Sequence, residues 1–123
     1  MSSLQSKDTN NKNKQNAIEF YQRCPSYVGS QYIQHNPDVE DGKEGFINYF
    51  NRMHADYSNK QIRFLRAIGE GDLVALHTHQ TWPGNEEYVT MDFFRFDEHG
   101  KIVEHWDAIQ KVPDAQAHNN TMF

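Results

Sequence analysis

The sequence predicts one small α+β domain in which helices come first and a meander of antiparallel strands follows. In the first half, apolar residues recur at helical spacing. In the second half, four segments rich in aromatic and aliphatic residues are separated by turn signals at short intervals. The chain of 123 residues has the usual length of one domain, so we expect a single core and a single site.

Three helices are expected before the strands. The first covers residues 17–24 and stops at Pro25, which cannot continue a helix. A short second helix is suggested by Val28, Tyr32 and Ile33, and the Asn36-Pro37 step should end it because the residue before proline avoids the α region. The third, at residues 43–57, has a wide apolar stripe and should therefore pack on a flat partner.

The strands supply that flat partner. We expect four antiparallel strands, at residues 61–70, 73–82, 88–97 and 101–110. Their turns contain Gly71, Gly84 and Gly100, and a curled sheet of this kind can enclose a pocket for a small organic molecule.

Composition narrows the function classes. The formal charge of -5 and the scattered Lys and Arg residues argue against nucleic acid as a partner. No apolar run is long enough to cross a bilayer, and residues 1–15 are too polar for a signal peptide, so we expect a cytoplasmic protein without a membrane partner. Residues 1–13 read as a disordered lead-in to a single domain at 14–123, and the lone Cys24 is expected to be a packed hydrophobe.

Titratable residues on otherwise apolar strands mark the candidate site. Asp92 lies among aromatic residues, where a charged carboxylate must be paired or have a raised pKa. His105 and Asp107 alternate onto one face of the last strand, while Glu104 and Trp106 alternate onto the other. This pattern favours proton transfer, and purely structural hydrogen-bonded partners are the alternative.

The expected register brings these three residues together. If the last turn pairs Asp97 with Gly100, Asp92 lies directly opposite His105, within side-chain reach of Asp107. A bulge at Gly100 would reverse which residues share a face.

Other polar residues are candidates for the same cavity. His77 and His79 share one strand face, and His35 and Asn36 lie where the second helix meets a loop. For each of them a purely structural role is the alternative. Two histidines near an aspartate also resemble part of a metal site, but the spacing of a ligand string is absent and we expect no metal.

Four segments together resemble the SnoaL-like polyketide cyclase family. They are YIQHNP (32–37), GDLVALH (71–77), MDFFRF (91–96) and GKIVEHWD (100–107), closed by NNTMF (119–123). The resemblance covers most of residues 17–123. It implies the cone-shaped fold of the nuclear transport factor 2-like superfamily, with three helices on a strongly curved sheet and frequent dimers through that sheet.

The resemblance also implies a reaction. The best-understood members close a ring by an aldol step with an acid/base aspartate on the last strand and no cofactor, and Asp107 is the matching position. In the related ketosteroid isomerases, a protonated aspartate that donates to an oxyanion corresponds to Asp92. Their base corresponds to Asn36, whose amide cannot take a proton from carbon, which argues against steroid isomerase chemistry.

The first hypothesis is therefore a cofactor-independent enzyme in which Asp107 abstracts a proton next to a carbonyl group, with His105 and Asp92 stabilising the enolate. The residues expected to orient or line the substrate are His35, Asn36, His77, Phe50 and Phe94. A binding module for a small apolar ligand is the second hypothesis. Metal-assisted hydrolysis through His77, His79 and His105 is the third.

The last expectation concerns assembly. Trp106 and its neighbours on the face away from the site leave an apolar surface that needs covering, which predicts a two-fold homodimer packed sheet to sheet. Covering of Trp106 by Met122 and Phe123 of the same chain is the alternative.

Overall fold

The computed structural model describes residues 11–17, 28–56 and 61–123. For residues 50–56 it describes the backbone only. Residues 11–17 form a helical segment. The elements that follow are β1 (Val28–Gln34), α2 (Gly42–Asp56), β2 (Gln61–Glu70), β3 (Leu73–Trp82), β4 (Glu86–Phe96) and β5 (Ile102–Lys111). Within these ranges, none of the helices has the length and apolar character needed to cross a membrane.

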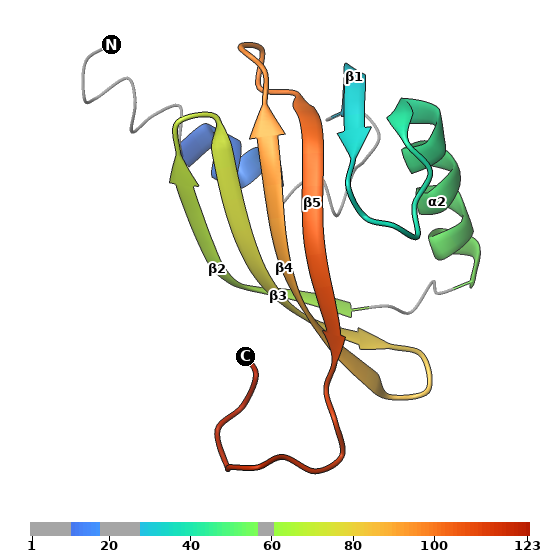
Figure 1. Ribbon diagram of the computed structural model, residues 1–123, viewed down its shortest axis with the longest axis vertical. Helices are drawn as coiled ribbons and strands as arrows, with labels where there is room; N and C mark the ends of the chain where they lie inside the picture. Colours follow the sequence, from blue (N-terminus) through green and yellow to red (C-terminus); the bar gives the residue numbers. More distant parts are fainter. Residues whose placement is uncertain (1–10, 18–27, 57–60) are drawn as a thin grey trace.

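One mixed sheet in the order β1-β5-β4-β3-β2 forms the body of the protein. Strands β2 to β5 are the antiparallel meander that the sequence predicts, and each lies within two residues of its expected bounds. Figure 1 shows that these strands curve strongly, with α2 beside β1 at one edge. Helix α2 also matches its prediction, and it begins directly after Asp41, a residue type that favours helix starts.

The predicted second helix is wrong, because residues 28–34 form strand β1. This segment contains Val28, Tyr32 and Ile33, which favour strands, and it pairs in parallel with the free edge of β5. The element does end before the Asn36-Pro37 step, but it is a strand and not the expected helix.

The three-helix arrangement is therefore not confirmed. Of the expected first helix, only Ala17 lies within the described residues, at the end of a helical segment that starts at residue 11. That segment includes the last three residues of the expected disordered lead-in. Residues 18–27, with Cys24 and Pro25, lie outside the described residues.

The β4–β5 register differs from the expected one by two residues. Asp92 lies opposite Asp107, and His105 lies opposite Phe94. One residue of the shift comes from the turn: Asp97 pairs with Lys101, through its N–H to the Lys101 carbonyl, and not with Gly100 as expected. Gly100 stays inside the turn with a φ of 75°. The other comes from a bulge next to Arg95. Because the two shifts add to an even number, Asp92, His105 and Asp107 still share one face.

That face, called the inner face here, is defined by the buried side chains of Val74, Leu76 and Phe94. Its apolar part joins a core that includes Tyr32 of β1 and Phe46 of α2. Further along β3 and β4, the same face changes to buried polar residues. The core thus ends where the polar cluster begins.

The opposite, outer face of the sheet carries exposed apolar side chains. Ile68, Met91 and Phe93 are 66%, 47% and 48% exposed. Trp106 is covered by the His35 ring, which stacks on it at 4.8 Å. The C-terminal tail lies elsewhere on this face: Phe123 stacks on His79 at 3.8 Å, so the alternative in which the tail covers Trp106 is wrong.

We expect the outer face to pair with the same face of a second copy, because exposed apolar surface is removed from water in that way. Phe93→Glu should convert a dimer into a species near 14.4 kDa, measured by light scattering at micromolar concentration. The matched control is Ile109→Glu, which should leave the dimer intact. Ile109 is also 47% exposed, but it lies opposite Thr90 on the inner face, away from the expected dimer contact. A mass near 14.4 kDa for the unaltered protein would contradict the expectation.

Candidate active site

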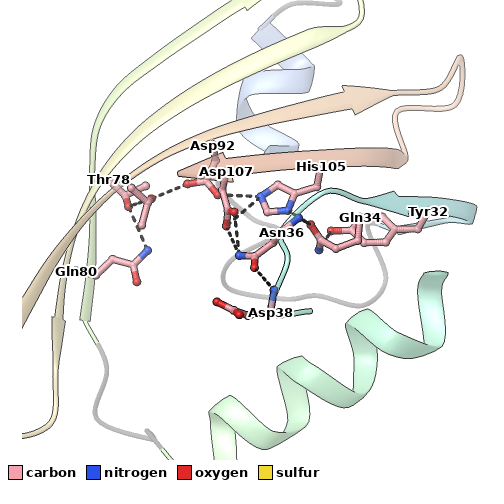
Figure 2. Close-up of polar contacts among 10 residues, drawn as sticks. Tyr32, Gln34, Asn36, Asp38, Thr78, Gln80, Asp92, His105 and Asp107 are labelled. Carbon is pink, nitrogen blue, oxygen red and sulfur yellow. Dashed lines mark hydrogen bonds and ion pairs between the residues drawn. The ribbon is translucent and has the colours of Figure 1, made fainter. Parts of the chain in front are cut away.

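Three titratable residues meet on the inner face of β4 and β5. His105 Nε2 lies 2.9 Å from Asp92 Oδ1 and 4.0 Å from Asp107 Oδ2. Figure 2 shows all three side chains pointing toward one another from adjacent strands. The structure therefore brings together the three residues predicted to be catalytic.

Asp107 is held by the loop that follows β1. The Asn36 amide nitrogen donates to both carboxylate oxygens, at 2.9 and 3.0 Å. The Asn36 oxygen accepts the backbone N–H of Asp38 at 2.8 Å, which fixes the amide so that its NH₂ group faces Asp107. Asn36, predicted to bind substrate, thus positions the candidate base.

Burial dominates the electrostatics of Asp107. It raises the pKa of this carboxyl above the ordinary value of 3.8, and the charge of His105 and the Asn36 hydrogen bond partly offset the rise. A carboxylate with a raised pKa is a stronger base, and the two favourable neighbours help it to stay ionised.

Asp92 is more completely enclosed than Asp107, and His105 is buried beside it. Asp92 is 1% exposed, and its second oxygen accepts the Thr90 hydroxyl at 2.6 Å. The second ring nitrogen of His105 lies 3.0 Å from Gln34 Oε1. Both oxygens of Asp92 and both nitrogens of His105 have partners in the protein, whereas the two oxygens of Asp107 share a single donor, the Asn36 amide nitrogen. With a side chain that is 10% exposed, against 1% for Asp92, Asp107 is the more accessible of the two carboxylates.

Several neutral residues of the cluster were not predicted from the sequence. The hydrogen-bond network around Asp92 and His105 also includes four neutral residues: Gln34, Thr78, Gln80 and Thr90. Thr78 and Gln80 could have been found from alternation, because they continue the inner-face positions of Leu76 along β3.

The predicted substrate residues separate into groups. Phe94 lies on the inner face, with its ring 4.8 Å from that of His105. His35 lies on the outer face, where its Nε2 is 2.8 Å from Glu104 and, with Arg95, lowers the pKa of that carboxyl. The side chain of Phe50 lies outside the described residues.

His77 also lies on the outer face. It adjoins Leu76 and Thr78, which point inward, and its ring contacts Arg66 and the Met122 carbonyl. The structure therefore does not bring His35 or His77 together with Asp107, because neighbouring residues of a strand point to opposite faces.

The described residues contain one group able to hold a metal ion. The ligand atoms of Asp92, His105 and Asp107 lie within 4.8 Å of one another. A cation would have to replace the direct Asp92–His105 hydrogen bond. The metal site considered from the sequence, with His77, His79 and His105, is not formed, since His77 and His79 lie on the outer face.

Comparison with known families identifies the chain. The SnoaL-like domain matches residues 20–105, so the protein belongs to the SnoaL-like family. A comparison with curated proteins found no match.

Solved structures show the same fold at low identity. AclR of Streptomyces galilaeus, a proposed hydroxylase, is 18% identical with a TM-score of 0.69 over 82% of this chain and 90% of AclR. A proposed ketosteroid isomerase from Kribbella flavida is 14% identical with a TM-score of 0.69, over 91% and 85% of the two chains. IdmH of Streptomyces antibioticus, a proposed polyketide cyclase, is 19% identical with a TM-score of 0.60, over 85% and 91%. The mixed five-stranded sheet is consistent with the expected nuclear transport factor 2-like fold.

The raised pKa of Asp107 predicts how Asp107→Asn changes stability with pH. A carboxyl whose folded pKa is raised stabilises the fold below its unfolded pKa, and this contribution is lost as pH rises through the folded pKa. The stability of the variant relative to the unaltered protein should therefore increase from pH 4 to pH 8. Urea unfolding at a series of pH values measures it.

The matched control is Gln116→Ala in the exposed tail, for which we expect the difference in stability to stay flat with pH because neither side chain ionises. If the stability of Asp107→Asn relative to the unaltered protein falls as pH rises, the fold favours the ionised form of Asp107 and the prediction is wrong.

Proposed function

We propose that this SnoaL-like protein is an enzyme that abstracts a proton next to a carbonyl group, in a reaction of the aldol or cyclase type, with Asp107 as the base. The observation that carries the proposal is the Asp107 carboxylate itself. It lies on the inner face with a 10% exposed side chain and a pKa raised by burial, fixed by Asn36. General bases work best when their pKa approaches the operating pH.

The proposed reaction balances without an added reactant. Asp107 takes the proton, and the electrons of the broken C–H bond form an enolate. The enolate carbon then forms a C–C bond to a second carbonyl carbon of the same molecule as the C=O π bond breaks, and the new alkoxide takes the proton from Asp107, which becomes a carboxylate again. The step needs no oxidant or reductant, in line with the sequence-based expectation of no cofactor.

His105 and Asp92 support this reaction indirectly in the proposed mechanism. Their hydrogen-bonding atoms are engaged with each other, Thr90 and Gln34. Direct donation to the enolate, as expected from the sequence, would require one of these bonds to open. The contacts favour a role in which the pair sets the electrostatic environment of Asp107.

An apolar carbonyl compound is the proposed substrate class. Ile109, two residues beyond Asp107 and thus on the same strand face, is 47% exposed, so apolar surface adjoins the carboxylate. Such surface suits the body of an organic molecule, while Asp107 suits its acidic C–H group.

Proton exchange tests the proposal without knowledge of the natural substrate. Aryl ketones such as 1-tetralone, and β-keto esters, are incubated with the protein in D₂O, and loss of the α-proton signal is followed by NMR. We expect catalysed exchange that falls about 100-fold or more in Asp107→Asn, the usual size of a general-base contribution. Asp114→Asn should exchange at the unaltered rate.

Binding without chemistry is the competing outcome. If ketones of the panel bind, as seen from perturbed protein resonances, yet none exchanges faster than in buffer, the protein is a binding module and the proposal is wrong.

A further inference from the structure

A chain of hydrogen bonds with one fixed direction runs along β3 and β4 to Asp92. It starts at Trp82, whose indole N–H can only donate and lies 3.1 Å from Gln80 Oε1. The Gln80 oxygen is therefore an acceptor, and its amide nitrogen donates to Thr78 Oγ at 3.2 Å.

The two threonines continue the chain in the same direction. Thr90 gives its single hydroxyl hydrogen to Asp92 Oδ2 at 2.6 Å. The 2.5 Å contact between the Thr78 and Thr90 hydroxyls must then have Thr78 as the donor. Every bond thus directs its positive end toward Asp92, and Thr78, Gln80 and Thr90 are at most 3% exposed.

A second donor-only group fixes the other side of the cluster. The backbone N–H of Asn36 donates to Gln34 Oε1 at 3.0 Å, which makes this oxygen an acceptor. His105 Nδ1, 3.0 Å from the same oxygen, must therefore carry a hydrogen.

One proton remains to be assigned, in the 2.9 Å contact between Asp92 Oδ1 and His105 Nε2. It belongs either to a neutral Asp92 beside a neutral His105 or to an imidazolium beside a carboxylate. Hydrogen bonds that point at a carboxylate favour its ionised form and strengthen one another in a buried site.

We propose that Trp82, Gln80, Thr78 and Thr90 are positioning residues that keep Asp92 ionised and thereby keep His105 doubly protonated beside Asp107. The titratable groups that face His105 in the described part of the chain are Asp92 from β4 and Asp107 from β5, whereas β1 presents the uncharged Gln34. The fixed positive charge lies 4.0 Å from the candidate base.

This inference deepens the proposed function, because it explains how a buried Asp107 can stay ionised. It also distinguishes the site from one in which Asp92 is a protonated donor to substrate. The enclosed Asp92 acts as an anion that holds a cation in place.

The ¹⁵N NMR spectrum of His105 tests the proposal in the absence of any substrate. Unaltered protein at neutral pH should show both ring nitrogens protonated. In Thr90→Val, which keeps the side-chain shape but removes the hydroxyl, the proton should move toward Asp92. Loss of a hydrogen bond to a charged group changes the ratio of the two forms about tenfold or more, and the Nε2 signal should shift accordingly.

Two companion variants separate this effect from a general loss of stability. Thr90→Ser should restore the imidazolium signal. Thr78→Val should shift it less than Thr90→Val does, since it lies one bond further from Asp92, and it provides a second measurement if Thr90→Val does not fold. Thr81→Val, on the outer face of the same strand, is the matched control and should leave the signal unchanged.

Three outcomes would overturn the inference. They are a neutral His105 in the unaltered protein, an unchanged Nε2 signal in a folded Thr90→Val or Thr78→Val, and displacement of the Nε2 proton when micromolar Zn²⁺ or Mn²⁺ is added to chelator-treated protein. None depends on turnover, so failure of the proposed reaction would be recognised separately.

Discussion

The hydrogen bond between Asp92 and His105 is the constraint on which the rest of the site depends. A carboxyl group that is 1% exposed is costly to bury unless its oxygens are paired. That requirement explains why the inner face changes from apolar residues to threonine, glutamine and histidine at this point along β3, β4 and β5. It also explains why the last residue of β1 is polar, since Gln34 holds the far side of the imidazole.

Sequence reasoning succeeds where the signal is local. The three hairpins follow from glycine-containing turns between segments of apolar character, and all three turn glycines adopt positive φ angles. Strand β1 has no such signal, because its partner β5 lies about 70 residues further along the chain. The two-residue register shift is equally invisible, since a turn and a bulge that each add one residue leave the alternation of faces intact.

The candidate site is predictable to a similar degree. Asp92, His105 and Asp107 stand out as titratable residues on apolar strands, and the structure places them in contact. Thr78 and Thr90 do not stand out, because neutral hydrogen-bonding residues occur on many strands. His35 and His77 were misplaced because a histidine that contacts an acidic residue or a backbone carbonyl on the outer face has the same local sequence pattern as one in a site.

The fold alone does not determine the chemistry, as the different reactions named for similar structures illustrate. In this chain, two aspartates that lie opposite each other on β4 and β5 have different proposed roles. One is enclosed and holds a charge in place. The other is reached from the inner face and is supported by an amide from a loop.

The pairing of β1 with β5 has a further consequence for folding kinetics. The hairpins of β2 to β5 join neighbours in the sequence, whereas the contacts of Asn36 with Asp107 and of Gln34 with His105 each span 71 residues. Contacts of such high sequence separation form late, because a long loop must close before they are made. We therefore expect the β2–β5 meander to form before the candidate base is fixed, so that a partly folded state lacking β1 would retain the meander but no organised site.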